Sequence, residues 1–224
     1  MKTDLSLGNA VGIFKDRHLC LYMATAALLW FLMFSPWTKG MASFWTLMSI
    51  SACVLSVIAL SEQPWKELKC KKTSASGIAL QLGAGTVLAF ALWGIFWVGD
   101  KASQWMFSFA GGQIDSIYGM KDGSNPVVIA LLLLLLIGPA EEFFWRGYVQ
   151  RRMGELCGQD TALVMTCVIY SLVHIWSFNF MLVAAAFVAG AVWGMLYRLR
   201  PSLLPALVIS HALWDALVFI ILPI

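Results

Sequence analysis

The chain has 224 residues, of which 60% are hydrophobic and 12% are charged. Ordinary soluble domains carry about 25% charged residues, so this composition excludes most soluble folds. The formal net charge of +3 is too small to indicate a nucleic-acid-binding protein. We therefore expect an all-α, polytopic membrane protein whose solvent is the lipid bilayer, with no nucleic acid among its partners.

The apolar residues gather in runs close to the ~20 residues that a helix needs to cross a bilayer. Seven such segments can be drawn, at about residues 19–35, 41–60, 77–98, 126–144, 160–178, 180–198 and 202–222. Each must be a helix, because lipid offers no water to satisfy exposed backbone groups. The sequence therefore predicts a helical bundle of about seven transmembrane helices, forming a single integral membrane domain over residues 1–224.

Two segments beside these spans need a separate interpretation. The first residues are polar and of mixed charge, and they lack the compact apolar stretch and small-residue cleavage site of a signal peptide. The first apolar run is therefore predicted to be a retained span. Residues 99–125 carry Trp105, Phe107 and Phe109. This pattern fits either a short amphipathic helix at the outer interface or an ordinary exterior loop.

The positive charges predict the orientation of the bundle, because cytoplasmic loops are rich in Lys and Arg. With the N-terminus inside, the cytoplasmic side receives Lys2, Lys15, Arg17, Lys66, Lys69, Lys71, Lys72, Arg146, Arg151, Arg152, Arg198 and Arg200. The outer side receives Lys39, Lys101 and Lys121. This asymmetry predicts a cytoplasmic N-terminus, and the short loops favour a bacterial cytoplasmic (inner) membrane.

The five cysteines form no CxxC pair and no zinc-binding spacing with histidine. They are Cys20, Cys53, Cys70, Cys157 and Cys167. Most lie within or beside apolar runs, where a free cysteine behaves as a small hydrophobic residue. We interpret all five as structural.

Ionisable residues within the apolar runs are concentrated in three short motifs of the C-terminal half. A charged group at the centre of a membrane helix costs ~2.5–3.5 kcal/mol on insertion scales, so such residues usually have a function. The motifs are GPAEEFFWR at 138–146, YSLVH at 170–174 and HALWD at 211–215. They provide the candidate catalytic residues Glu141, Glu142, Arg146, His174, His211 and Asp215.

In the first motif, Glu142 and Arg146 are four residues apart, so they share a helix face and can form an ion pair. Glu141 lies about 100° further round the helix, in an environment of its own. Two adjacent acids in a low-dielectric site do not ionise alike, which makes Glu141 the candidate for a general base working near neutral pH. Pro139 removes a backbone hydrogen bond just before the motif, and we expect it to open the helix to water.

The other motif residues come from different spans. His211 and Asp215 are four residues apart and can meet, and a carboxylate beside an imidazole fixes its tautomer. Convergence of His174 on Glu141 depends on bundle packing, which the sequence permits without establishing. A GxxxG pattern at 190–194 predicts a close approach of two helices.

Each feature also has a purely structural explanation. A buried Glu–Arg pair can serve as scaffolding, and Asp215 can serve only to satisfy His211. A lone buried histidine is often a hydrogen-bonded core residue. The joint occurrence of two acids, one arginine and two imidazoles in an otherwise apolar bundle favours a functional site.

Together these motifs resemble those of the CPBP family, which groups the type II CAAX prenyl endopeptidases with bacterial bacteriocin-processing and immunity-type membrane proteases. The resemblance rests on EExxxR, an aromatic-xxx-His and HxxxN or HxxxD, in this order, within a motif-bearing core at about residues 126–222. Residues 1–125 resemble the family only in being hydrophobic spans.

The resemblance implies a role for each motif residue. Glu141 resembles the glutamate that activates water, with His174 assisting it. Glu142 and Arg146 resemble the supporting acid and its partner. His211 resembles the residue that stabilises the oxyanion together with the last motif position.

Two motif positions depart from the family's usual residues. Position 215 is Asp where Asn is typical, and an ionised Asp cannot donate a hydrogen bond to an oxyanion. Asp215 would have to be protonated, or act by orienting His211. Tyr170 stands where Phe is more usual, which is a milder change.

The resemblance implies an intramembrane endopeptidase that needs no cofactor. Water activated by Glu141 would hydrolyse a peptide bond in a membrane-anchored or lipid-modified polypeptide, for example a prenylated one, in a cavity between the fourth, fifth and seventh spans. No Ser or Cys nucleophile with a matching base lies near the motifs, which argues against a covalent mechanism.

Three alternatives remain open on the sequence. Two His and one Glu form a ligand set that catalytic zinc uses, although no HExxH is present. A non-enzymatic membrane binding or immunity protein could retain the motifs. A proton-coupled transporter would use Glu and His as relays, but it would usually show repeats with broken helices in both halves.

Overall fold

A computed structural model describes residues 13–38, 40–62 and 74–224 of the protein. The predictions for Cys70, Lys2, Lys39, Lys66, Lys69, Lys71 and Lys72 lie outside these residues. The α-helices are α2 (Arg17–Phe34), α3 (Phe44–Ser61), α4 (Ala75–Met106), α5 (Ala110–Tyr118), α6 (Pro126–Leu132), α7 (Gly138–Glu142), α8 (Arg151–Cys157), α9 (Gln159–Leu172), α10 (Phe180–Leu199) and α11 (Leu204–Ala216). Shorter 3-10 or π-helical segments are η2 (Gly119–Lys121), η3 (Leu133–Ile137), η4 (Phe143–Gln150), η5 (Val173–Ser177), η6 (Pro201–Leu203) and η7 (Leu217–Ile221).

The predicted all-α polytopic fold is confirmed in the described part of the chain. Seven helical stretches are long and apolar enough to cross a membrane: Arg17–Phe34, Phe44–Ser61, Ala75–Met106, Pro126–Cys157, Gln159–Ser177, Phe180–Leu199 and Pro201–Ile221. The third and fourth run well beyond their predicted ends at residues 98 and 144. The fourth is one continuous helical rod, made of α6, η3, α7, η4 and α8. Its second half is rich in polar residues that are buried in the protein, so hydropathy ended the predicted span too early.

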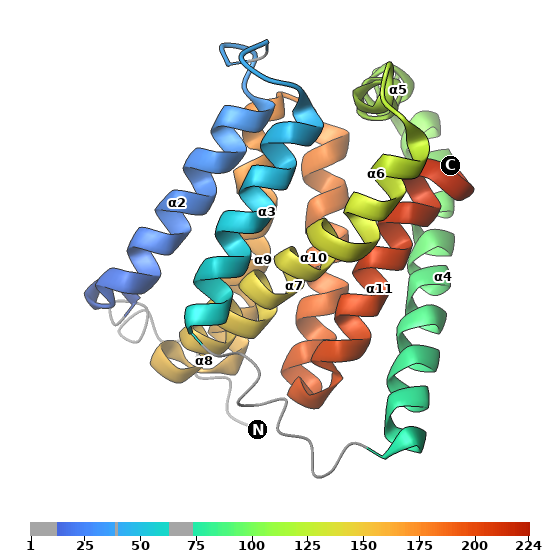
Figure 1. The fold of residues 1–224 in the computed structure, drawn as a ribbon. Helices are drawn as coiled ribbons and strands as arrows, with labels where there is room; N and C mark the ends of the chain where they lie inside the picture. Colours follow the sequence, from blue (N-terminus) through green and yellow to red (C-terminus); the bar gives the residue numbers. More distant parts are fainter. Residues whose placement is uncertain (1–12, 39, 63–73) are drawn as a thin grey trace.

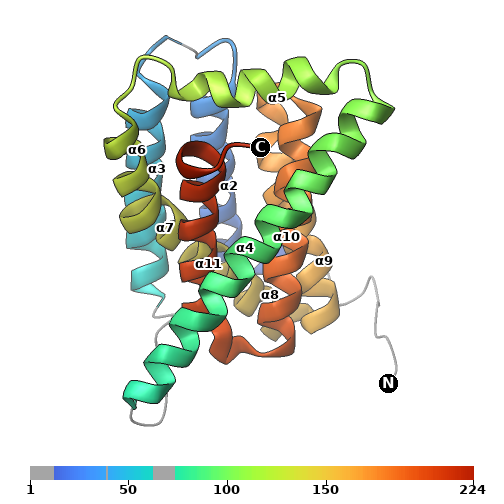
Figure 2. The same cartoon turned by 90° about the vertical axis from the view of Figure 1, so that its right-hand side faces the viewer.

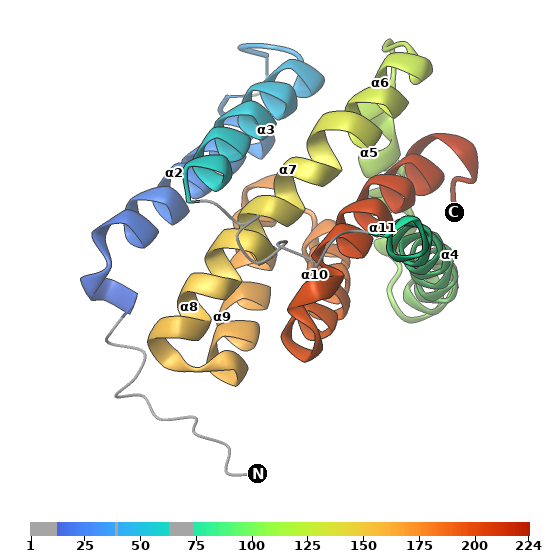
Figure 3. The ribbon, with the colours of Figure 1, turned by 60° about the horizontal axis from the view of Figure 1, so that its bottom comes forward.

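The fourth rod lies in the middle of the bundle. The α2–α3 pair lies on one side of it, and α11 followed by α4 lies on the other (Figures 1 and 3). The rod contacts α3, α9 and α11, and α10 packs along α9. Residues on the rod are therefore enclosed by other helices, and this arrangement shields the charged groups of the first motif from lipid.

Local sequence features explain where the rod begins and how closely its middle approaches α11. The side chain of Asn125 accepts a hydrogen bond of 2.9 Å from the Val127 N–H and caps the helix, and Pro126 occupies its first turn. A Cβ added at Gly138 would lie 2.7 Å from the Cα of Ala212, so only glycine lets α7 cross α11 at this distance. The opening expected at Pro139 takes the form of the π-helical turn η3 directly before α7, and the helix continues through it.

Helix α5 lies across one end of the bundle, nearly perpendicular to the spans (Figure 2). Of the two interpretations of residues 99–125, the structure therefore has the short helix, preceded by a longer α4. The Asn179 side-chain amide donates to the carbonyl oxygen of Gln113 at 2.8 Å, and the Ile224 N–H donates to the Tyr118 hydroxyl at 3.1 Å. These bonds fasten α5 to α10 and to the C-terminus.

The outer faces of the helices are covered with large apolar side chains. Helix α4 alone exposes Leu80, Val87, Phe90 and Val98. Such a surface is far more apolar than the surface of a soluble monomer, and together with the seven spans it supports an integral membrane protein. Described basic residues flank the spans: Arg17 begins α2, Arg152 lies in α8 and Arg198 near the end of α10, whereas Lys101 lies near the end of α4 and Lys121 in η2, directly after α5. Which end faces the cytoplasm stays a prediction.

Candidate active site

A buried ion pair lies at the centre of the fourth rod. Glu142 is 0% exposed and Arg146 is 1% exposed. The Arg146 Nη1 donates to Glu142 Oε1 at 2.7 Å, as the four-residue spacing predicts, and its Nη2 donates to the Gly190 carbonyl oxygen at 3.2 Å. A Cβ at Gly190 would lie 2.9 Å from Cδ1 of Tyr170, so the GxxxG pattern does allow α10 to approach its neighbours closely.

His211 on α11 is joined to this pair. Its Nδ1 lies 2.8 Å from Glu142 Oε1, whereas its Nε2 lies 3.6 Å from Asp215 Oδ2. The expected partner Asp215 is therefore a neighbour of the His211 ring at a distance too long for a hydrogen bond. Because a carboxylate can only accept, the His211 Nδ1 carries a proton, and Glu142 fixes this tautomer. The ring also stacks on Trp193, with centroids 4.0 Å apart and an interplanar angle of 19°.

Glu141 is held by a residue of the second motif. The Tyr170 hydroxyl on α9 donates to Glu141 Oε2 at 2.9 Å. Glu141 is 4% exposed and Tyr170 is 5% exposed, so this bond is shielded from solvent. The two motifs are thus brought together across the bundle, through a hydroxyl group that the more usual Phe would lack.

His174 follows one turn later, in η5. Its Nδ1 lies 2.8 Å from the Tyr170 carbonyl oxygen, and its Nε2 accepts a hydrogen bond of 3.1 Å from the indole Nε1 of Trp30 on α2. The carbonyl requires a proton on Nδ1, and the indole requires a lone pair on Nε2. His174 is therefore held as the neutral Nδ1–H tautomer.

A cavity of about 430 Å³ lies in front of these residues. Its wall includes the motif side chains Glu141, Tyr170, His174, His211 and Asp215. Most of the other lining residues are apolar or aromatic, and they come mainly from α2, α3, α4, α5, η3, α10, α11 and η7. The cavity therefore extends beyond the predicted fourth, fifth and seventh spans. Glu142 and Arg146 are not among the lining residues. The site thus has a front layer that faces the cavity and a charged pair behind it.

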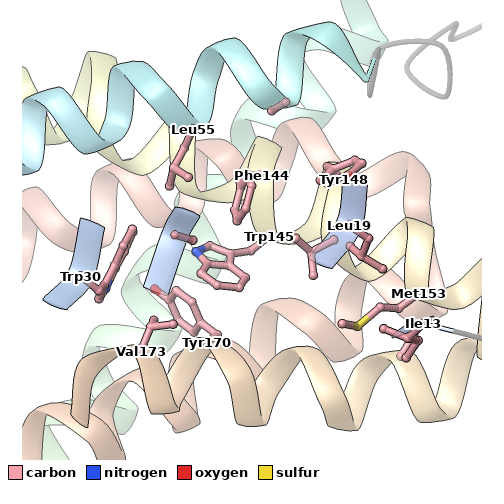
Figure 4. Close-up of a cluster of buried hydrophobic side chains, with 14 of the residues drawn as sticks. Ile13, Leu19, Trp30, Leu55, Phe144, Trp145, Tyr148, Met153, Tyr170 and Val173 are labelled. Carbon is pink, nitrogen blue, oxygen red and sulfur yellow. The ribbon is translucent and has the colours of Figure 1, made fainter. Parts of the chain in front are cut away.

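The site is backed by a hydrophobic cluster between α2, α3, η4 and α9 (Figure 4). Trp145 lies in this cluster, and its ring meets those of Trp30 and Tyr170 edge to face at centroid distances of 6.2 and 5.3 Å. Figure 4 has the three rings side by side. Because buried aromatic packing resists rotation, the cluster keeps Tyr170 and Trp30 in place beside Glu141 and His174.

Comparison with protein families finds a match over residues 123–217, to the family described as type II CAAX prenyl endopeptidase Rce1-like. This range contains all three motifs and the whole of the front and back layers of the site. The motif-bearing part of the chain is therefore similar to the CPBP family. Comparisons with curated proteins and with solved structures found no match. The matched family is one of endopeptidases, so the match supports a peptidase of the CAAX protease type.

The described motif residues are not arranged as the donor set of the zinc alternative. Among the described residues, no group of three His, Cys, Asp or Glu side chains is arranged to hold a metal ion. His174 Nε2 already accepts from Trp30, and His211 Nδ1 is directed at Glu142. We therefore derive no catalytic step through a metal.

Three residues at this site were not predicted as contacts of the motif residues. The Tyr170 hydroxyl had a signal in the sequence, because the position departs from the usual Phe. Trp30 and Trp193 had none, since nothing in a sequence distinguishes a tryptophan that meets a histidine from one in an interfacial belt. Trp30 also lies outside the range that matches the family.

Proposed function

We propose that the protein is an intramembrane endopeptidase in which Glu141 activates the water that hydrolyses the peptide bond. The observation that carries the proposal is the position of Glu141, a carboxylate on the cavity wall with one oxygen held by Tyr170 and a buried ion pair behind it. Among the described carboxylates on the cavity wall, Glu141 is the one that a motif side chain holds by a hydrogen bond.

The chemistry needs one group that accepts a proton and later returns it. With Oε2 of Glu141 held by Tyr170, Oε1 is the oxygen that can bind a water in the cavity. Glu141 takes a proton from this water as the hydroxide attacks the substrate carbonyl carbon. It then gives the proton to the leaving nitrogen as the C–N bond breaks, which is general base and general acid catalysis by one group.

The residues behind Glu141 have a supporting role. Arg146 and Glu142 are fully enclosed, so they act through orientation and charge rather than through contact with substrate. Glu142 bridges Arg146 and His211 through the same oxygen, Oε1, and so links the rod to α11. Neutral His174, with both ring nitrogens engaged, is better suited to fixing the cavity wall than to sharing the proton of the water.

The cavity supports a substrate that comes from the bilayer. Its volume lies within the ~300–1,000 Å³ of typical ligand sites, and its wall is mostly apolar along its length toward α5. We propose a membrane-anchored or lipid-modified polypeptide, cleaved at the depth of Glu141. In keeping with the charge asymmetry, the N-terminus would be cytoplasmic, in a bacterial inner membrane.

The test is cleavage of candidate membrane-anchored peptides by the purified protein in lipid vesicles. Glu141→Gln should abolish cleavage while the protein still folds, because the amide cannot take up the proton. The matched control is Asp100→Asn, since Asp100 is a buried carboxylate of the same cavity whose partners, Lys101 and Gln104, lie outside the motifs. Full activity in Glu141→Gln would refute the proposal.

A further inference from the structure

The motif side chains of the cavity wall contain few hydrogen-bond donors. Ionised Glu141 and Asp215 can only accept. His174 uses its Nδ1–H on the Tyr170 carbonyl, and its Nε2 accepts from Trp30. Hydrolysis nevertheless creates a negative charge on the substrate carbonyl oxygen, and such oxyanions are stabilised by donors placed in advance.

His211 does not fill this gap in its neutral form. Its proton is on Nδ1, where Glu142 requires it, so Nε2, which lies 3.6 Å from Asp215 Oδ2, has only a lone pair. It donates from Nε2 only when the ring holds a second proton. Among the motif side chains on the cavity wall, Tyr170 and Trp214 therefore have donors that need no additional proton, and of these two it is Tyr170 that is hydrogen-bonded to Glu141.

The hydroxyl of Tyr170 is also next to the group where the charge begins. In the substrate-free protein it donates to Glu141 Oε2 at 2.9 Å. When Glu141 takes the proton of the water, the negative charge leaves this carboxylate and develops on the substrate oxygen. Hydrogen bonds to an ionised acceptor are roughly twice as strong as those to a neutral one, so the preferred acceptor changes during the reaction.

We infer that Tyr170 is a further catalytic residue, whose hydroxyl transfers its hydrogen bond from Glu141 to the oxyanion and so supplies the donor that an ionised Asp215 cannot. Tyr170 keeps its own proton throughout, and the proton of the water travels through Glu141 alone. The inference rests on the proposed function and specifies how its transition state is stabilised.

The ring of Tyr170 is held firmly enough for this role. The Arg146 guanidinium carbon lies 4.9 Å from the ring centroid, and Trp145 packs against the ring edge to face. On a third side the ring lies against Gly190, where even an added Cβ would come within 2.9 Å of Tyr170 Cδ1. A ring enclosed in this way keeps the hydroxyl directed at the reacting atoms, which is the condition for electrostatic stabilisation without reorganisation.

A double-mutant cycle tests the inference, using kcat and KM for peptide cleavage. Tyr170→Phe should lower kcat by about 10²-fold with little change in KM, the usual effect of removing one oxyanion donor. Asp215→Asn places an amide donor on the same cavity wall. The double variant, Tyr170→Phe with Asp215→Asn, should therefore have a kcat about tenfold higher than Tyr170→Phe alone. Asp215→Asn alone should raise kcat above the wild-type value, because the wall then has the amide donor as well as the Tyr170 hydroxyl.

The control is Tyr148→Phe, because Tyr148 is 1% exposed, belongs to the same hydrophobic cluster and does not line the cavity. It should leave kcat unchanged, and thermal unfolding of both Phe variants checks that they fold. If Tyr170→Phe unfolds more readily, Asp215→Asn alone still decides: a loss as deep as that of Glu141→Gln would contradict the inference, because the Asp215 carboxylate itself would then be required.

Two further outcomes would overturn the role of Tyr170 while leaving the proposed function intact. One is wild-type kcat in Tyr170→Phe with no activity in Glu141→Gln. The other is a loss of kcat in Tyr170→Phe that Asp215→Asn does not relieve, which would mean that Tyr170 only holds Glu141 in place.

Trp214 also lines the cavity, and its indole N–H has no partner among the described residues. A larger kcat loss in Trp214→Phe than in Tyr170→Phe would therefore assign the donor to Trp214. Activity in Glu141→Gln would instead refute the proposed function.

Discussion

The indole Nε1 of Trp30 donates a hydrogen bond of 3.1 Å to Nε2 of His174. The two residues are 144 positions apart, and Trp30 lies in the half of the chain that the family match does not cover. The lone pair on His174 Nε2 therefore already accepts a hydrogen bond. Helix α2 is thus part of the site, although its sequence carries no motif.

Replacing Trp30 by Phe should free the His174 Nε2 and lower the rate of peptide cleavage. The loss of one neutral hydrogen bond, worth about 0.5–1.5 kcal/mol, corresponds to a two- to tenfold effect. Nitrogen NMR of histidine-labelled protein should report a proton on Nδ1 and none on Nε2 in the wild type, with the Nε2 signal shifted in the variant.

The control for this change is Trp145→Phe, another buried tryptophan of the same cluster, which donates no hydrogen bond to His174. It should leave the His174 signals in place. An unchanged Nε2 signal in Trp30→Phe would contradict the assigned tautomer, whatever the activity.

Arg146 should matter mainly for stability and organisation. Removing it leaves Glu142 as an uncompensated buried charge, which typically destabilises by about 3–5 kcal/mol. Arg146→Met should therefore lower the thermal unfolding midpoint strongly in detergent. Arg152→Ala is the matched arginine on the same rod, because its pairs with Asp16 and Glu155 are partly exposed and worth at most about 1 kcal/mol. Equal midpoints for the two variants would count against a buried pair at the core of the site.

Gly190→Ala should disturb the site although no motif residue is replaced. The new Cβ would meet Tyr170 Cδ1 at 2.9 Å and Arg146 Nη2 at 3.6 Å, so the tyrosine ring must shift. Overpacking of this kind costs about 1–3 kcal/mol, and activity should fall with it. Gly94→Ala on α4 adds the same methyl group where nothing lies within 4 Å, and it should be neutral. A fully active Gly190→Ala would show that α9 and α10 are not in close contact there.

The pH dependence of stability should have a contribution from Asp16 at the start of α2. Burial raises the pKa of the Asp16 carboxyl, but the hydrogen bonds from the Leu19 N–H and the Arg152 guanidinium outweigh it, so the pKa lies below its ordinary value. The ionised cap therefore stabilises the fold above the ordinary pKa of the carboxyl, and this stabilisation is lost as the pH falls through the lowered value.

Asp16→Ala should cost about 1 kcal/mol at neutral pH, the usual value for a helix N-cap, and less in acid. The comparison is Ser43→Ala, which removes the cap of α3 but no titrating group. Its cost should not change with pH. Thermal unfolding at several pH values measures both, and a cost of Asp16→Ala that is constant with pH would contradict the assignment.

Much of the fold could be predicted because a bilayer imposes it. The apolar runs had to be helices, and seven of them were found near their predicted places. The prediction ended the fourth span too early, since Arg146 and Gln150 looked like the end of a membrane segment. Both side chains are buried and donate to carbonyl groups of α10, so the protein interior replaces the solvent that hydropathy assumes.

The site could be predicted only where the contacts are local. The spacing of Glu142 and Arg146 predicted their pair correctly, because four residues make one helical turn. The same rule suggested Asp215 as the partner of His211, whereas the closer partner is Glu142, 69 positions away. Contacts between helices, such as Tyr170 with Glu141, depend on packing that spacing along one chain does not encode.

The central claim is that Glu141 activates water without a metal ion. The most direct measurement is the rate of peptide cleavage by the purified wild-type protein with and without a chelator, together with the metal content by mass spectrometry. We predict an unchanged rate after chelation and less than stoichiometric metal. A rate that falls with the metal and returns on addition of zinc would contradict the mechanism and make the same residues zinc ligands.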